Sequence, residues 1–345
     1  MKSLVATAPG KLVLCGEYAV LDGAPAISAA VDRRARVAVC ETGDGGNVEV
    51  RTVGFNDGVY SFRATDSGLT AVGEQGALPL LESAWSSSQS NAAGGMSLEL
   101  ETGAFFASSD KHGLGSSAAL TVKIAKALAA WSGSDAGVEA RTGMIHSHLQ
   151  EGRGSGVDIA TSTVGGLICF ESQRLDEADS TATTRSSVGH IKWPAGVEAA
   201  VLFSGIAAST PAKLARLGSQ SRLPISDRLV EAAAGAADAW QQGNADQVLH
   251  ATARFAQTLA KFSDAYGLDV FGGGHAALAE LAQARGLVYK PCGAGGGDIG
   301  VVLGDDAAAI ARFAERAAAS GFVALDVRLG GKTEVEGLAV EWTHD

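Results

Sequence analysis

Short apolar runs separated by turn residues dominate the first 60 residues of the chain and predict β-strands there. The runs that carry this prediction are 4–8, 12–16 and 35–40, with turn signals at Pro9-Gly10 and Asp22-Gly23. From 64 to 95 the chain is rich in Gly, Ser and Ala, and only the stretch near 79–86 is expected to be helical.

Longer apolar runs follow and change the predicted structure to helix. A glycine turn after His112 opens into a run that ends at Ser132-Gly133, which predicts a helix between them. A second helix is expected over 138–150, and a strand over 166–170. The polar stretch 172–190 shows no pattern of its own, so we place a domain boundary at its end.

The boundary gives two predicted domains, residues 1–190 and 191–345. In the second domain the helical patterns and the strand patterns are interspersed. The expected helices are 211–217, 225–241, 244–265, 275–285 and 307–319, and the expected strands are 198–203, 287–290, 299–303 and 322–329. Strands mixed with helices, without strict βαβ alternation, predict an α+β fold.

Composition narrows the function classes. The 345 residues include 27 Lys and Arg against 38 Asp and Glu, a net charge of -11. Such a surface repels nucleic acid and anionic lipid, so neither is an expected partner, and an anionic ligand must meet a local positive patch. The four cysteines form no C-x-x-C pair and are expected to be free, buried thiols. Without an apolar leader or a run of about 20 apolar residues, a cytoplasmic location is expected.

The segment 110–119, DKHGLGSSAA, leads directly into a predicted helix and carries the sharpest chemical signal. A helix N-terminus presents unpaired N–H groups, glycines let the backbone approach a phosphate, and Ser116 and Ser117 add hydroxyls. An ordinary turn with a serine cap accounts for the same residues, so both interpretations stay open. The loop is not a Walker A motif. Formal dinucleotide matches at 113–118 and 295–300 lack the required context, which makes a nicotinamide enzyme a weak alternative.

Two further segments place charged residues among apolar or glycine neighbours. Lys11 lies among predicted strand residues, where its ammonium group faces a ligand, an acid or solvent. Asp158 closes the loop GRGSGVD, which also fits a simple turn aspartate. Neither segment decides the function alone.

Taken in order, three segments resemble the motifs of the GHMP kinase family of small-molecule kinases. They are APGKLVLCGEYAVL (8–21), KHGLGSSAAL (111–120) and KPCGAGGGDIGVVL (290–303). The resemblance implies two α+β domains with ATP and the acceptor in the cleft between them. Tyr18, Lys111, the GRGSGVD loop and 205–210 resemble the branch whose acceptor, 5-phosphomevalonate, already carries a phosphate.

The resemblance also implies roles for individual residues. Lys11 and Asp158 are expected to form a catalytic pair, with Lys111 beside the transferred phosphoryl group. The residues expected to bind ATP are Lys111, Gly113, Leu114, Gly115, Ser116, Ser117 and Ala118. Those expected to bind the acceptor are Lys11, Tyr18, Ser155, Gly156, Ser209, Thr210, Ala294 and Gly295. Magnesium is expected at Ser117 and Glu151.

Other acceptors and reactions remain open at this point. A family kinase acting on mevalonate is the main alternative, and it needs a general base because its acceptor is an alcohol. A phosphate acceptor has a second pKa of about 6 and is already ionised, so cations matter more than a base. The decarboxylase branch fits Lys111 and Tyr18 poorly, and a non-catalytic sensor does not need Lys11 and Asp158. The oligomeric state is left open.

Overall fold

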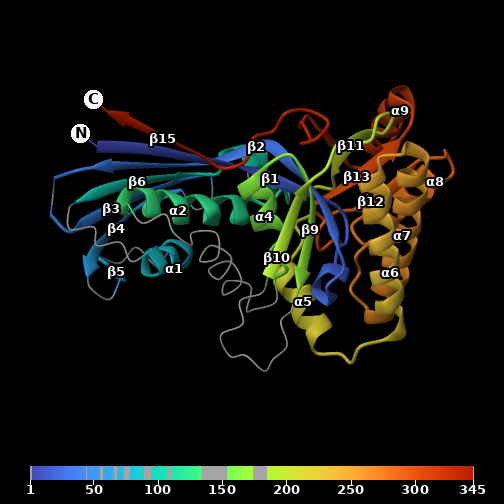
Figure 1. The fold of residues 1–345 in the computed structure, drawn as a ribbon, viewed down its shortest axis with the longest axis horizontal. Coiled ribbons are helices and arrows are strands. Elements are labelled where there is room, and N and C mark those ends of the chain that lie inside the picture. Colours follow the sequence, from blue (N-terminus) through green and yellow to red (C-terminus); the bar gives the residue numbers. More distant parts are fainter. Residues whose placement is uncertain are drawn as a thin grey trace.

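The computed structural model of the chain describes residues 2–43, 45–54, 57–65, 68–73, 78–88, 95–107, 110–133, 154–173 and 185–344. Within these ranges a large sheet and a smaller sheet are each covered by helices, which confirms the α+β class predicted from the sequence. The two chain ends lie next to each other at one end of the large sheet (Figure 1).

The large sheet has nine strands in the described part of the chain. They are β1 (Lys2–Cys15), β2 (Ala26–Glu41), β3 (Asn47–Val53), β4 (Gly58–Thr65), β5 (Gly68–Ala71), β6 (Met96–Glu101), β9 (Leu167–Gln173), β10 (Arg185–His190) and β15 (Ala339–His344). Their order is β10-β9-β2-β6-β3-β4-β5, and β1 pairs with both β2 and β15. Only β3 and β6 run parallel among the pairs in this sheet of described residues. A separate short ribbon joins β7 (Phe106–Ala107) to β8 (Asp110–Lys111).

Helices α1 (Pro79–Ser88), α2 (Ser116–Ser132) and α4 (Val157–Val164) lie along one side of the large sheet (Figure 1). Of two 3-10 turns, η1 (Ala19–Asp22) connects β1 to β2, and η2 (Gly103–Phe105) leads from β6 to the short β7 strand. The end of α2 is the one the sequence predicts, because Gly133 adopts a left-handed φ of 71° and donates its N–H to the carbonyls of Ala129 and Ala130.

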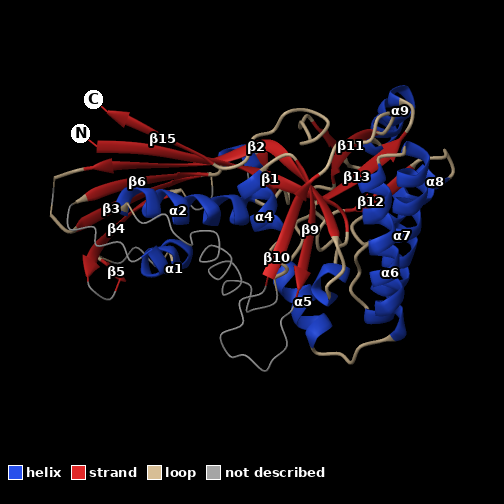
Figure 2. Ribbon diagram, viewed as in Figure 1, coloured by secondary structure: helices blue, strands red, loops and turns tan. Residues whose placement is uncertain are grey.

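The smaller sheet has the order β12-β13-β11-β14, with all its pairs antiparallel. Its strands are β11 (Glu198–Phe203), β12 (Val288–Pro291), β13 (Ile299–Gly304) and β14 (Val323–Leu325). The helices of this part are α5 (Thr210–Gly218), α6 (Pro224–Gln242), α7 (Ala245–Tyr266), α8 (His275–Gln283) and α9 (Ala307–Ala318). Figure 2 shows α6 to α9 gathered at the end of the molecule that holds this sheet.

One apolar core runs through the junction of the two parts. It includes Leu14 and Ile27 from the large sheet together with Trp240 and Phe255 from α6 and α7, all fully buried. Burying these side chains in one cluster holds the two sheets in a fixed arrangement around whatever lies between them. The division at residue 190 stays a prediction. The structure adds that 339–344 return to the first sheet, where β15 pairs with β1.

Three sequence predictions of secondary structure are wrong. Pro9-Gly10 is no turn: it lies inside β1, where a shift in register accommodates the proline. The stretch expected to lack structure contains β10, and the strand expected over 322–329 is reduced to β14. Of the strands that the sequence analysis missed, β5, β10 and β15 lie at a sheet edge and are held by backbone pairing to one neighbour rather than by an alternating apolar face. The helix expected over 138–150 lies outside the described residues.

The prediction of free, buried thiols is confirmed for three of the four cysteines. All four cysteines are free, and Cys15, Cys169 and Cys292 are buried, whereas Cys40 is half-buried. Among the described residues, none of the helices combines the length and the apolar character needed to cross a membrane.

Candidate active site

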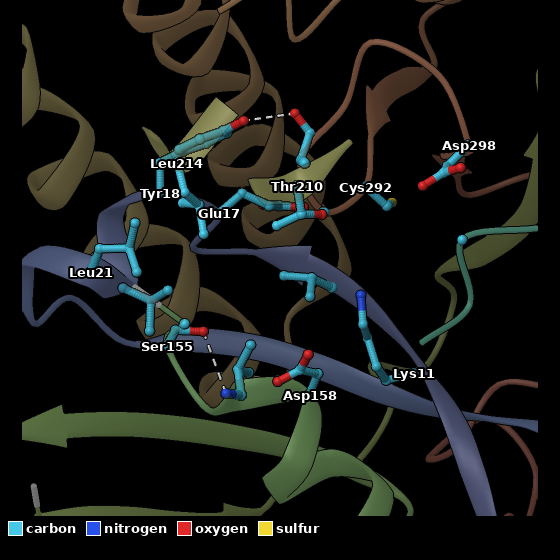
Figure 3. Close-up of a pocket in the computed structure, with 17 residues that line it drawn as sticks. Lys11, Glu17, Tyr18, Leu21, Ser155, Asp158, Thr210, Leu214, Cys292 and Asp298 are labelled. Carbon is cyan, nitrogen blue, oxygen red and sulfur yellow. Dashed lines mark hydrogen bonds between the residues drawn. The ribbon is translucent and has the colours of Figure 1, made fainter. Parts of the chain in front are cut away.

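A pocket lies where the large sheet, the start of α4 and the smaller part of the molecule meet (Figure 3). It draws residues from both sides of position 190, and most of them belong to the motifs found in the sequence. The lining residues are Lys11, Val13, Glu17, Tyr18, Val20, Leu21, Gly113, Gly154, Ser155, Val157, Asp158, Thr210, Leu214, Cys292, Gly293, Ala294 and Asp298.

Lys11 connects the first motif to the other two. Its backbone N–H donates to the carbonyl of Leu114 at 2.8 Å, which fixes β1 against the glycine turn before α2. The Lys11 side chain lies against Gly115, where an added β-carbon would come within 2.9 Å of Lys11 Cγ. The Nζ of Lys11 lies 3.8 Å from the position that an added β-carbon would occupy on Gly293. Figure 3 shows this side chain extending from β1 into the space between Asp158 and Asp298.

The turn before α2 is built to leave backbone N–H groups available. Gly113 and Gly115 have φ of 75° and 82°, which side chains rarely adopt. Gly115 is the residue before the helix, and no side chain in the described part of the chain caps it. The first N–H groups of α2 and the positive end of its dipole are therefore free to bind an anion.

Two other helices begin at the same pocket. Asp158 lies in the first turn of α4, after Gly156 with φ of 84°, and the Ser155 hydroxyl accepts from Val157 N at 3.4 Å. Thr210 begins α5. With α2, three helix N-termini meet near one pocket, so their dipoles add a positive potential that does not depend on the net charge of the chain.

Tyr18 and Glu17 fix the first motif to the third. Tyr18 is buried in a left-handed conformation with φ of 61°, and its hydroxyl donates to the carbonyl of Ala294 at 2.7 Å. Glu17 forms a buried ion pair with Lys290, whose side chain is fully buried and also donates to the carbonyl of Val13. The second carboxylate oxygen of Glu17, Oε2, is buried without a hydrogen-bond partner among the described residues.

Positive charge gathers beside the turn. The Lys111 side chain is exposed overall, yet neighbouring protein atoms partly desolvate its ammonium group and lower its pKa. Lys11 lowers this pKa further, whereas Asp298 raises it. Partial burial also lowers the pKa of Lys213 on α5, against the effects of Asp269 and Asp298. The positive charges of Lys11, Lys111 and Lys213 all lower the pKa of Asp298, in a protein that is otherwise acidic.

His275 contacts the glycine-rich turn before β13 through its ring nitrogens. Its Nδ1 lies 2.8 Å from the Tyr289 hydroxyl and its Nε2 lies 3.0 Å from the carbonyl of Gly297. Burial lowers the pKa of His275 to about 4, so the ring is neutral near pH 7. A neutral ring matches this geometry, donating to the carbonyl through Nε2 and accepting from Tyr289 through Nδ1.

The structure brings together most of the residues predicted to form the site. Those that line the pocket are Lys11, Tyr18, Gly113, Ser155, Asp158, Thr210 and Ala294. Those outside its lining but next to a lining residue in the chain are Leu114, Gly156, Ser209 and Gly295. Lys111 lies before the turn, in β8, and Gly115, Ser116, Ser117 and Ala118 continue the turn into α2. Leu114 is fully buried, and Gly295 packs against Val270. Glu151 lies outside the described residues.

Two charged residues of the pocket were not singled out in the sequence analysis. Glu17 and Asp298 both lie inside the quoted motifs, GEYAVL and GGGDIG, so the signal was present in the sequence. What was missing was the partner of each: Lys290 for Glu17, and the three lysines for Asp298.

Comparison with known proteins gives similarity over most of the chain. No family model matches it. The phosphomevalonate kinase of Streptomyces sp. strain CL190 is 32% identical over 342 residues, covering 88% of this chain and 90% of that protein. The mevalonate kinase of Methanothermobacter thermautotrophicus is 36% identical over 172 residues, covering 49% of this chain and 50% of that protein.

A solved structure extends the similarity to the fold. Streptococcus pneumoniae phosphomevalonate kinase in complex with phosphomevalonate and AMPPNP matches with a TM-score of 0.75 and 20% sequence identity. The match covers 94% of this chain and 99% of that one. The arrangement of both sheets and their helices is therefore shared over nearly the whole chain.

Proposed function

Because the chain belongs to the GHMP kinase family, we propose that it transfers the γ-phosphoryl group of ATP to (R)-5-phosphomevalonate, giving 5-diphosphomevalonate and ADP. The observation that carries this proposal is the pocket itself: Lys11 lines it, three helices begin beside it, and Lys111 and Lys213 act electrostatically on its Asp298, in a protein of net charge -11. The reaction belongs to the mevalonate pathway of isoprenoid synthesis, and the proposal assumes the cytoplasmic location expected from the sequence.

The chemistry of this acceptor matches such a pocket. The acceptor phosphate is largely a dianion near pH 7, so its oxygen attacks the γ-phosphorus without first losing a proton. The bond between the γ-phosphorus and the bridging oxygen breaks, and ADP leaves with that electron pair. The main obstacle is repulsion, since two unit charges 4 Å apart cost about 4 kcal/mol at an effective dielectric of 20. Fixed cations offset this repulsion, whereas a base does not.

The ATP phosphates are assigned to the turn before α2. The backbone N–H groups from Gly113 to Ser117 and the uncapped start of α2 hold the phosphate oxygens. Lys111, the last residue of the short β8 strand, lies beside the transferred group. Lys11 lies across Gly115 and is placed between this turn and the acceptor.

The acceptor is assigned to the part of the pocket between α4 and α5. Ser155 and Thr210 offer hydroxyls there, with Ser209 and Gly156 next to them in the chain. Asp158 orients Lys11 or the acceptor rather than taking a proton.

Magnesium fits the residues at the start of α2. The Ser117 side chain is exposed in the first turn, and hydroxyl oxygen with phosphate oxygens is a donor set that Mg²⁺ accepts. Among the described residues no group of three or more His, Cys, Asp or Glu side chains converges, so the protein contributes few ligands and the phosphates supply others. Glu151 remains the proposed second ligand. When bound, the ion neutralises charge on the β- and γ-phosphates.

The test is ADP release by the purified protein with ATP and Mg²⁺, with 5-phosphomevalonate and mevalonate compared side by side. We expect kcat/KM to favour 5-phosphomevalonate by about 100-fold or more, which corresponds to about 2.7 kcal/mol of differential transition-state binding. A preference for mevalonate would contradict the proposed acceptor and make Asp158 a general base. Nucleotide binding without turnover of either compound would contradict the proposed activity.

A further inference from the structure

Asp298 lies at the meeting point of three segments that the proposed reaction uses. It belongs to the glycine-rich turn before β13 and lines the pocket. Its backbone N–H donates to the carbonyl of Ile206 at 2.6 Å, and its carbonyl accepts from Ser204 N at 2.8 Å. The backbone of Asp298 is thereby tied to the segment that leads to Ser209 and Thr210.

The side chain of Asp298 continues this connection on both sides. Its Oδ1 accepts from the backbone N–H of Ala208 at 3.1 Å, directly before Ser209. On the other side the carboxylate lies over the turn before α2, because a β-carbon on Gly113 would come within 2.7 Å of Asp298 Oδ2. A single carboxylate therefore contacts the segment assigned to the acceptor and the turn assigned to the ATP phosphates.

The charged side chains that most affect the pKa of Asp298 are three lysines. Burial raises the pKa of Asp298, and the Ala208 N–H, Lys11, Lys111 and Lys213 act in the opposite direction. The lysines come from three different elements, β1, β8 and α5. Lys213 is held by a hydrogen bond to the carbonyl of Asp269 at 2.9 Å, so Lys11 and Lys111 are the two directed to the transferred phosphoryl group in the proposed function.

The conformation of Asp298 supports a specific role for this side chain. Its φ of 53° is left-handed, a region that favours glycine and costs other residues on the order of 1 kcal/mol. The turn contains glycine at 293 and from 295 to 297, and all four also have positive φ. Among positions 295 to 298, only Asp298 contacts the turn before α2 and also has its pKa lowered by the three lysines.

We propose that Asp298 is a positioning residue for phosphoryl transfer: its carboxylate holds the ammonium groups of Lys11 and Lys111 toward the turn before α2 and anchors the segment that carries Ser209 and Thr210. This inference rests on the proposed function. It assigns Asp298 no proton transfer and no bond to substrate. A carboxylate set among three ammonium groups directs them and limits their mutual repulsion before the phosphates arrive.

Two substitutions separate the charge of Asp298 from its hydrogen bond. Asp298→Asn keeps an oxygen for the Ala208 N–H and tolerates the left-handed backbone, but removes the negative charge. Asp298→Gly removes both without straining the backbone. Asp305→Asn is the matched control, because it makes the same charge change at an exposed residue beyond β13.

The readouts are kcat and KM for 5-phosphomevalonate as functions of pH, with ATP affinity measured by calorimetry over the same pH range. For Asp298→Asn we expect kcat to fall at least about tenfold. Because Asp298 raises the pKa of Lys111, its loss should move the alkaline limb of kcat and of ATP affinity to lower pH. For Asp298→Gly we also expect KM for the acceptor to rise at least about fivefold, because Ala208 loses its partner.

The outcomes distinguish this inference from the proposed function. Kinetics of Asp298→Asn within about threefold of wild type, with an unmoved alkaline limb, would overturn the positioning role. A lower kcat together with a lower melting temperature, but with no shift in the pH dependence, would also overturn the positioning role. That result is what the loss of a purely structural residue gives. If the wild-type protein does not act on 5-phosphomevalonate, the proposed function fails. The shift in the pH dependence of ATP affinity then still decides the role of Asp298.

Discussion

The side chain of Lys11 lies against the backbone of Gly115, so closely that a methyl group on Gly115 would come within 2.9 Å of Lys11 Cγ and 3.1 Å of Cε. This contact joins the strand that carries the first motif to the residue that starts α2. The lysine therefore reaches the turn before α2 because the residue at 115 has no side chain.

The substitution Gly115→Ala tests this contact. It introduces strain at a φ of 82° and forces Lys11 to move, so we expect kcat/KM to fall at least about tenfold. Gly133→Ala at the other end of α2 is the control, because Gly133 has a φ of 71° but no atom within 4 Å of its added β-carbon. It should cost about 1 kcal/mol of stability and leave the kinetics unchanged.

Steady-state kinetics and urea unfolding of both variants provide the measurement. Equal kinetic effects from Gly115→Ala and Gly133→Ala would show that backbone strain alone matters, and that the position of Lys11 does not.

Lys11 itself should be essential for turnover. In Lys11→Met the apolar stem is retained and the charge is lost, so we expect kcat to fall by on the order of 100-fold or more. Lys11→Arg should recover part of the activity, because the charge remains while the shape of the head group changes. Turnover of the Met variant within about threefold of wild type would remove Lys11 from the proposed mechanism.

Asp158 should matter less than a general base does. Removing a base costs about 10²- to 10⁴-fold in rate, whereas the proposed acceptor is already ionised. We therefore expect Asp158→Asn to lower kcat by less than about 100-fold with 5-phosphomevalonate. The measurement is kcat for both acceptors, and a larger loss with 5-phosphomevalonate would assign Asp158 a proton-transfer role.

The parts of the site that depend on neighbours in sequence could be predicted. The glycine turn, the start of α2 and its end at Gly133 follow from local residue types, as does the placement of Lys11 on a strand. Asp298 shows why the rest could not. Its significance depends on lysines at 11, 111 and 213, which come close only after β1, β8 and α5 have packed around the turn before β13.

Long-range pairing also explains the missed strands. β15 is fixed by hydrogen bonds to β1, with Lys2 opposite His344, and the sequence near 339–344 does not reveal this partner. The ion pair of Glu17 and Lys290 is similar, because 273 positions separate its members. Neither residue alone indicates a buried ion pair, since most charged side chains lie at the surface.

Lys123, an ionisable residue outside the pocket lining, leads to a prediction about the stability of the protein. Lys123 on α2 is fully buried, and its Nζ has no hydrogen-bond partner among the described residues. Burial lowers the pKa of Lys123 from 10.5 to about 6, with Arg34 adding to the reduction and Glu101 opposing it. The folded protein therefore contains neutral Lys123 at pH 7 to 8, while the unfolded chain holds the proton up to about pH 10.

The sign of the pH effect follows from this difference. Between pH 6 and 10.5 the unfolded state binds more protons at this residue, so its contribution to the free energy of unfolding rises with pH. The rise is at most about 1.4 kcal/mol per pH unit. Below about pH 6 both states are protonated and the contribution becomes constant. At neutral pH the lysine is therefore a source of instability, and Lys123→Met should stabilise the protein.

Urea unfolding of the wild-type protein and Lys123→Met at pH 6.5, 7.5 and 8.5 measures this contribution, because the effects of all other groups cancel in the difference. We expect the variant to be the more stable protein at each pH, with an advantage that shrinks as the pH rises. Lys126→Met makes the same substitution on the same helix at a half-buried side chain, and it is the comparison variant. An advantage for Lys123→Met that stays constant or grows over this range would mean that the buried lysine keeps its proton in the folded state.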